Sequence, residues 1–185
     1  MLWIDVSKGL KTVPRIRACE LPDIALLRRY LDQDAYVDCY STEIDGEVPH
    51  SRYVSAFYSS WLFKIERWIL GWSVKRPSSS DDVVTLANGT SDRFAAWEVE
   101  ARDENQLMLC DLFGRTRSWL MTATSNERSA TVTRLYFGSA VVPRTGSRSL
   151  GFTYRALLGF HKLYSRALLH LAKARLQAEQ ARLAR

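Results

Sequence analysis

The chain has 185 residues, is 46% hydrophobic and carries a formal net charge of +6. This length and composition predict one globular domain with a sizeable core. No window of about eighteen residues is both apolar and uncharged, which excludes a membrane-spanning helix. Residues 1–6 lack the charged start and the long apolar run of a secretory signal.

The net charge is distributed unevenly along the chain. From Arg144 to Arg185 there are nine basic residues and one acidic residue, Glu179, a surplus of +8 that leaves about −2 for the rest. One interpretation is a solvated face of a helix, which is common. The other is attraction to anionic lipid or nucleic acid.

The N-terminal third is expected to be an extension over residues 1–16, then a short helix and a strand. Leu21-Pro22-Asp23 opens the helix, because proline suits a first helical turn and Ile24, Leu27 and Leu31 recur at helical spacing. Alternation over residues 36–42 predicts a strand that ends at the turn Asp45-Gly46.

A second helix is predicted from Arg52 to Trp72, with Ser51 as its N-cap. Its apolar stripe consists of Val54, Phe57, Tyr58, Trp61, Ile65, Trp68 and Trp72. The charges that interrupt the stripe are few and of mixed sign, which favours a core helix packed on a sheet. The alternative is an interfacial membrane helix.

A meander of strands is predicted next. Residues 76–82 and 88–92 are rich in turn formers, and residues 83–87 between them suit a short helix or strand. Strands are expected at residues 94–101, 106–111, 115–124 and 130–142, with turns at 103–105 and 125–127. In the first strand Ala95, Trp97 and Val99 share one face and Glu98 and Glu100 the other; in the last, Leu135, Phe137 and Val141 share a face. Loops this short make consecutive strands antiparallel neighbours.

The segment Asp111-Leu112-Phe113-Gly114-Arg115 has the residues of a tight hairpin, with Asp first and Gly at the left-handed position. Pairing Asp111 with Arg115 places two sets of side chains on one face: Leu107, Leu109 and Asp111 from one strand, and Arg115, Arg117, Trp119 and Met121 from the other. On this prediction an apolar floor ends in a carboxylate and two guanidiniums. They form either a cross-strand ion pair or a site in which Arg117 meets an anionic ligand.

The C-terminal element is predicted to be a long helix from Gly151 to Ala178, with Ser147 or Ser149 as N-cap and fraying beyond it. Its buried stripe consists of Tyr154, Leu157, Leu158, His161, Tyr164, Leu168 and Leu171, widened by Phe160, Leu163, Ala167 and Ala174. Arg155, Lys162, Arg166, Lys173 and Arg175 fall largely on the opposite side. His161 is therefore expected to be more than half buried, bonded to the backbone or to a neighbouring hydroxyl, with catalysis as the less favoured role.

These elements together predict an α+β fold, with a curved antiparallel sheet packed on a long C-terminal helix and a second, aromatic-rich helix. Such a sheet has one face to bury, and the two long helices must cover it. The domain is expected over residues 17–178, with a frayed basic tail at 179–185. The space between sheet and helix is either a ligand cavity or a solid core.

Four segments carry a resemblance to a known family: residues 94–100 (FAAWEVE), 111–120 (DLFGRTRSWL), 135–142 (LYFGSAVV) and 159–169 (GFHKLYSRALL). Over most of the chain from Arg17 to Arg175 the sequence resembles an uncharacterised family of bacterial proteins. The layout of that family is similar to helix-grip domains, the START and polyketide-cyclase-like proteins. The resemblance implies a lipid or other apolar ligand held between the sheet and the C-terminal helix.

The sequence contains no motif of established chemistry. There is no dinucleotide fingerprint, no P-loop, no H-E-x-x-H and no nucleophile elbow. His50, His161 and His170 have no metal-ligand spacing, so neither a metal nor a cofactor is expected. Cys19, Cys39 and Cys110 are far apart and odd in number, which predicts reduced thiols in the cytosol. Nucleic acid is an unfavoured partner, because the strand aromatics lie on apolar faces.

The function expected from the sequence is therefore binding of an apolar or amphipathic small molecule in a cavity between the sheet and the C-terminal helix. The candidate ligand-binding residues are Trp97, Leu109, Asp111, Arg115, Arg117, Trp119, Phe137, His161 and Tyr164. One alternative is a cyclase- or dehydratase-like enzyme that uses His161, Tyr164, Asp111 and Arg117 as polar groups. Another is a peripheral scaffold protein that makes weak membrane-surface contact through its basic C-terminal helix. No oligomeric state is predicted.

Overall fold

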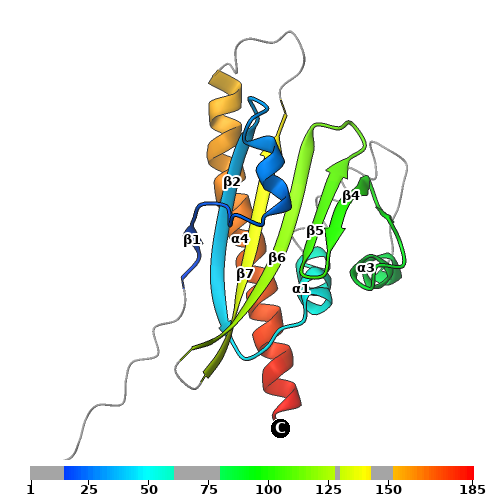
Figure 1. Ribbon diagram of the computed structural model, residues 1–185, viewed down its shortest axis with the longest axis vertical. Helices are drawn as coiled ribbons and strands as arrows, with labels where there is room; N and C mark the ends of the chain where they lie inside the picture. The colour runs from blue at the N-terminus through cyan, green and yellow to red at the C-terminus, as the bar shows by residue number, and fades with distance from the viewer. Residues whose placement is uncertain (1–14, 61–79, 128–129, 143–151) are drawn as a thin grey trace, which may run out of the picture.

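The computed structural model describes residues 15–60, 80–127, 130–142 and 152–185 of the chain (Figure 1). The fold is α+β, with a curved antiparallel sheet of seven strands in the order β1-β2-β7-β6-β5-β4-β3. The strands are β1 (Arg17–Ala18), β2 (Tyr36–Asp45), β3 (Arg93–Phe94), β4 (Trp97–Asp103), β5 (Gln106–Asp111), β6 (Thr116–Glu127) and β7 (Ala130–Val141). The helices are η1 (Leu26–Tyr30, a 3-10 helix), α1 (His50–Tyr58), α3 (Ser80–Ala87) and α4 (Phe152–Leu183). The predicted fold class is confirmed, and the layout is helix-grip-like.

Helix α4 runs along one face of the sheet, behind β2 and β7 in Figure 1, and α1 lies beside it on the same side. The core on this face, here the α4-side core, is rich in aromatic residues. Phe57 of α1 is fully buried and lies 4.8 Å, centroid to centroid, from the ring of Phe137. The hydroxyl of Tyr53 donates to the carbonyl oxygen of Tyr136 at 3.0 Å, which satisfies the polar end of a buried ring. Aromatic rings of α1 and β7 therefore pack directly on one another beneath this part of the sheet.

The opposite face of the sheet is also buried, although only one buried face was expected. The short helix η1 covers it, and the η1-side core contains Ala25, Leu27, Tyr30, Cys39, Met108, Trp119, Met121 and Ala140. Gln106 fastens η1 to the sheet: its side-chain oxygen accepts from the Leu26 amide and from Trp119 Nε1, and its nitrogen donates to the Ile24 carbonyl. A buried amide with all these partners orients the helix.

The predicted short helix differs from the observed one. It begins at Leu26 and not at Pro22, and Ile24 and Leu31 are 66% and 49% exposed. Only Leu27 of the predicted stripe is buried. In a 3-10 helix residues three apart share a face, so the α-helical stripe that linked Leu27 to Leu31 does not apply.

The second helix is also shorter than predicted. α1 begins at His50, directly after Pro49, and ends at Tyr58, so the single helix to Trp72 is wrong; residues 61–72 lie outside the described residues. Ser51 is not the N-cap, because Pro49 takes that position. Residues 80–82, expected in a loop, are the first turn of α3, where Asp81 and Asp82 suit the positive end of a helix dipole.

The first strand of the meander is interrupted at its start. Ala95 has a left-handed backbone (φ 54), so β3 and β4 form a tight hairpin instead of one strand over residues 94–101. A register shift between Val99 and Ala101 makes Glu100 the extra residue of a β-bulge. At the other hairpin β6 continues to Glu127, so the turn expected at residues 125–127 is wrong.

Helix α4 continues past the predicted end at Ala178 to Leu183. The frayed tail expected from residue 179 is wrong because Glu179 pairs with Arg52 of α1 at 3.2 Å and Gln180 donates to the Asp45 carbonyl at 3.0 Å. Lys173, expected toward solvent, is 4% exposed, and Leu163, expected in the stripe, is 68% exposed. Among the described helices, none has the length and hydropathy to cross a membrane.

Candidate functional site

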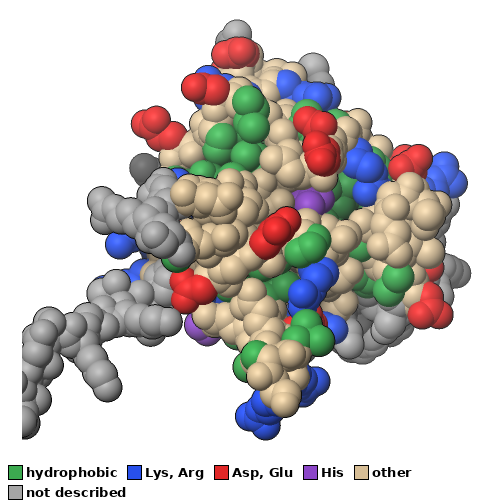
Figure 2. Space-filling view, turned by 60° about the horizontal axis from the view of Figure 1, so that its bottom comes forward, with side chains coloured by type: hydrophobic (Ala, Val, Ile, Leu, Met, Phe, Trp, Pro, Cys, Tyr) green, Lys and Arg blue, Asp and Glu red, His purple; other side chains and the backbone are tan. Residues whose placement is uncertain are grey.

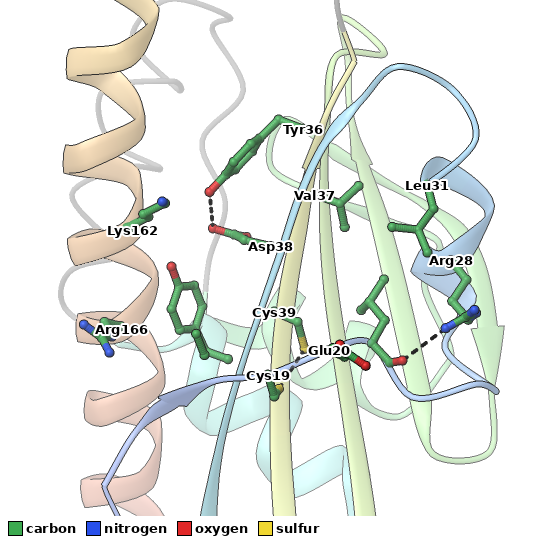
Figure 3. Close-up of a pocket in the computed structure, with 13 residues that line it drawn as sticks. Cys19, Glu20, Arg28, Leu31, Tyr36, Val37, Asp38, Cys39, Lys162 and Arg166 are labelled. Atoms are coloured by element: carbon green, nitrogen blue, oxygen red, sulfur yellow. Dashed lines mark hydrogen bonds between the residues drawn. The ribbon is translucent and has the colours of Figure 1, made fainter.

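An open pocket with a volume of about 650 Å³ lies at the outer edge of the first half of β2 (Figure 3). Segments far apart in the sequence form its walls: the chain after β1, helix η1, strand β2 and helix α4. The lining residues are Ala18, Cys19, Glu20, Leu21, Arg28, Leu31, Tyr36, Val37, Asp38, Cys39, Tyr40, Lys162 and Arg166. This volume is within the range of small-molecule sites.

The pocket exists because β1 covers only part of β2. The two strands pair at Arg17–Ser41 and Ala18–Tyr40, and the last contact is the Cys19 amide donating to the Cys39 carbonyl at 3.0 Å. Beyond Cys39 the chain before η1 separates from β2 and leaves its edge uncovered by the described residues.

Side chains on both faces of β2 reach this edge because a strand alternates its side chains. Tyr36, Asp38 and Tyr40 point toward α4, whereas Val37 and Cys39 lie on the η1 side (Figure 3). The pocket therefore has a polar wall toward α4 and a more apolar wall toward η1, where Leu31 is half-exposed.

Positive charge exceeds negative charge around the pocket. Arg28 from η1 and Lys162 and Arg166 from α4 stand against Glu20 and Asp38. Arg28 pairs with the exposed Asp23 at 3.5 Å, and the Arg166 guanidinium lies 5.7 Å from the Tyr40 ring centroid. Burial, and next the Asp38 charge, raise the pKa of the Tyr40 phenol, so it stays neutral at physiological pH.

A chain of hydrogen bonds links α4 to the sheet beside the pocket. The Asp38 carboxylate accepts from the hydroxyl of Ser139 at 2.6 Å and from the hydroxyl of Tyr36 at 3.2 Å. Ser139 Oγ lies 2.7 Å from His161 Nε2, and that nitrogen is 3.6 Å from Asp38 Oδ2. The expectation for His161 is confirmed: its side chain is 25% exposed and its partner is a neighbouring hydroxyl.

The proton positions in this chain follow from counting donors. An ionised carboxylate only accepts, so the single proton of Ser139 points to Asp38. The Ser139 oxygen must then accept from His161, which places a proton on Nε2. Ser139 therefore lacks the free basic nitrogen that activates a serine nucleophile. The arrangement connects α4 to the sheet.

The predicted site residues are divided between the two faces of the sheet and do not form one site. Trp97, Leu109 and Phe137 are buried in the α4-side core, against which Tyr164 packs. Trp119 is buried in the η1-side core. His161 approaches the pocket through Asp38, and Phe137 lies opposite the pocket-lining Tyr40 in the β2–β7 register.

The predicted hairpin register is wrong by one residue. Asp111 Oδ1 accepts from the amides of both Arg115 and Thr116, which adds Arg115 to the loop. The strands consequently pair with Cys110 opposite Arg117 and Leu109 opposite Ser118. Arg117, Trp119 and Met121 thus share a face with Met108, and not with Leu107 and Leu109. The Gly114 prediction is confirmed, since it has φ +66.

Arg117 is occupied by partners on the η1 side. Its Nε donates to Glu100 Oε2 at 2.9 Å, another guanidinium nitrogen donates to the Gly114 carbonyl, and the guanidinium carbon lies 4.6 Å from the Tyr30 ring centroid. The Tyr30 hydroxyl also bonds to Glu100. Burial, then this bond to Glu100, raise the pKa of Tyr30 to about 12. In this cluster Arg117 joins η1 to the sheet.

The pocket residues Asp38, Lys162 and Arg166 and the adjacent Ser139 were not proposed from the sequence. A signal existed in residues 36–40, where Asp38 stands between Tyr36 and Tyr40 on one face of an alternating strand. A carboxylate on an aromatic face of a strand needs hydrogen-bond or charged partners, so Asp38 could have been proposed from the sequence as a polar site.

Comparison with known proteins finds no matching family model and no matching curated protein.

Proposed function

We propose that this protein binds an amphipathic anion, a lipid-like molecule with an acidic head, in the pocket at the edge of β2. The observation that carries the proposal is a hollow with partly apolar walls that has Lys162 and Arg166 on its α4 side and Arg28 on its η1 side (Figure 3). Guanidinium and ammonium groups recognise carboxylate and phosphate heads. Ala18, Leu21, Leu31 and Val37 supply apolar contact for a short chain or ring.

The proposed location differs from the one expected from the sequence, a cavity between the middle of the sheet and α4. Phe57 and Phe137 fill that region in the described structure. An enzymatic role has narrower support, because the Ser139 hydroxyl beside His161 donates its proton to Asp38 and is not activated by a free basic nitrogen. A cytosolic location belongs to the same proposal and is in keeping with the three free thiols.

Docking of the basic C-terminal helix to a membrane surface has less support than the pocket. Figure 2 views the molecule toward the end at which α4 terminates and shows acidic and basic side chains interspersed. Arg175 pairs with Glu179, which also pairs with Arg52. These contacts reduce the charge that this part of α4 offers to an anionic surface.

The test is binding of a fluorescent fatty acid to purified protein, with native mass spectrometry to detect any molecule that copurifies. The variant Lys162→Glu/Arg166→Glu reverses two charges at the pocket and should weaken binding by about tenfold or more, since about 1.4 kcal/mol corresponds to tenfold. The control Arg182→Glu/Arg185→Glu makes the same charge change at the far end of α4. Equal binding by both variants would contradict the proposed site.

A further inference from the structure

Two cysteines face each other at the wall of the pocket. Cys19 and Cys39 are opposite residues on neighbouring antiparallel segments, joined by the Cys19 amide and the Cys39 carbonyl at 3.0 Å. Their sulfur atoms are 3.4 Å apart and both thiols are free. Opposite residues of an antiparallel pair have Cα atoms about 4.5–5.5 Å apart, which is within the range that a disulfide spans. Bond formation therefore requires the sulfurs to approach but no rearrangement of the strands.

The two thiols have different environments. Cys39 is 4% exposed in the η1-side core, whereas Cys19 is partly exposed and lines the open pocket. The hydrogen bond between the two sulfurs, the largest effect, lowers the pKa of Cys19 to about 6, with smaller contributions from Ser41 and Arg134 against the effect of burial. The same hydrogen bond, together with burial, raises the pKa of Cys39. The pair thus joins a partly exposed thiol of lowered pKa to a buried thiol of raised pKa.

We propose that Cys19 and Cys39 form a reactive dithiol site at which a hydroperoxide oxidises the pair to a disulfide. In the first step the Cys19 thiolate attacks the outer oxygen of the hydroperoxide, the O–O bond breaks, and the leaving alkoxide or hydroxide takes a proton from water. Cys19 becomes a sulfenic acid and the hydroperoxide is reduced to an alcohol or to water. In the second step the Cys39 sulfur attacks the Cys19 sulfur, the S–O bond breaks, and the Cys39 proton leaves with the hydroxyl as water.

The third cysteine provides an internal reference for the reaction. Burial is the main reason that the pKa of Cys110 is raised above its ordinary value, 9.0. At pH 7 Cys19 therefore has the larger thiolate fraction, although the lower nucleophilicity of the less basic thiolate offsets part of this advantage. Cys19 should react faster than Cys110, and of these two only Cys19 has a neighbouring thiol that converts the sulfenic acid into a disulfide.

The experiment treats the reduced full-length protein with hydrogen peroxide and follows intact mass and peptide maps over time. The Cys110→Ala variant should lose about 2 Da, the two thiol hydrogens. Its peptide map should show Cys19 linked to Cys39, and a thiol reductant should reverse the change. Adding Cys39→Ala should stop the reaction at a Cys19 sulfenic acid that dimedone traps. Adding Cys19→Ser instead should abolish the mass decrease of about 2 Da. Circular dichroism tests whether each variant is folded.

The dependence on pH distinguishes this site from ordinary thiol oxidation. The oxidation rate of Cys19 should rise through about pH 6 and level off near neutrality, whereas the rate of Cys110 should still rise above pH 8. The proposal is overturned if the Cys19→Ser protein still loses the mass expected for disulfide formation. It is also overturned if Cys19 and Cys110 are oxidised at equal rates to sulfinic acids and no disulfide forms. It stands independently of the proposed anion binding, because the test contains no ligand.

Discussion

The two faces of the sheet are buried by different means. On the α4 side, helices α1, α3 and α4 supply a broad apolar layer in which aromatic rings pack on one another. On the η1 side, one 3-10 helix of five residues covers the sheet and depends on polar anchors, Gln106 and the group Tyr30–Glu100–Arg117. A long helix can bury a wide stripe through hydrophobic contact alone. A short helix needs directional bonds to fix its position.

The largest effect is expected from removing apolar volume on the α4 side. Phe57→Ala deletes a fully buried ring that contacts Phe137 and should lower the free energy of unfolding by about 3–5 kcal/mol. Urea denaturation followed by circular dichroism measures the change. Exposed Phe113, 70% accessible at the hairpin tip, is the matched control, and Phe113→Ala should cost less than about 0.5 kcal/mol. Similar costs for both would contradict the assigned core.

Acid should weaken the α4 side through His50. This imidazole is partly buried at the start of α1, its Nε2 has no hydrogen-bond partner, and burial lowers its pKa to about 4. The unfolded chain takes up a proton near pH 6.5 while the folded chain does not, so stability is full above pH 6.5 and declines toward pH 4. The loss should reach about 3 kcal/mol, at about 1.4 kcal/mol per pKa unit. Urea denaturation at several pH values tests this prediction. In His50→Gln the free energy of unfolding should no longer show this decrease between pH 6.5 and pH 4.

Alkali should weaken the η1 side through Tyr30. Its pKa of about 12 in the folded state is above the ordinary value of 10.0. The protonated Tyr30 phenol therefore contributes fully to the free energy of unfolding below pH 10. This contribution, about 2–3 kcal/mol, is lost as the pH rises from 10 to 12. Phenolate absorbance of the protein and of Tyr30→Phe isolates the titration. Glu100→Gln should lower the Tyr30 pKa; an unchanged titration would remove Glu100 as a cause.

The smallest effect concerns the space between η1 and the sheet. A Cβ added at Gly138 would lie 2.8 Å from Leu27 Cδ2 and 2.9 Å from Trp119 Cε3, so Gly138→Ala should cost about 1–3 kcal/mol. Leu27→Ala removes the nearest of these contacts. In a double-mutant cycle the two substitutions should cost less together than the sum of their separate costs, and strict additivity would exclude the clash.

The two faces also differ in how far the sequence could predict them. The hairpin at residues 103–106, strands β5 and β7, and the burial of His161 follow from alternation and helical spacing, and the structure confirms them. The β5–β6 register could not be predicted from alternation. Both faces of β5 are apolar, with Leu107 on one and Met108 on the other, so either register buries hydrophobic groups. The register depends instead on Asp111 and its two backbone hydrogen bonds.

The pocket was missed for a similar reason. It is assembled from residues that are separated by more than a hundred positions, such as Asp38 and Lys162, and no local pattern reports such a juxtaposition. The cover of the η1 side was missed because the short helix predicted there was given α-helical spacing and the sheet was expected to be covered by the two long helices alone, whereas a five-residue 3-10 helix covers a second face. Local patterns predicted the elements and the class of fold, whereas contacts between distant segments determined the candidate site.

The placement of β2 beside β7 has a consequence for the order of folding. Strands β4 to β7 follow one another and pair with their sequence neighbours, so each hairpin can close as soon as it has been synthesised. Strand β2 has only the two-residue strand β1 as a sequence neighbour, and its long pairing is with β7: the bond from Ser139 to Asp38 spans 101 residues. This pairing must wait until β7 has emerged from the ribosome, and its closure is the high-contact-order step that is expected to limit the folding rate. The wall of the pocket that α4 supplies is consequently among the last parts of the molecule to form.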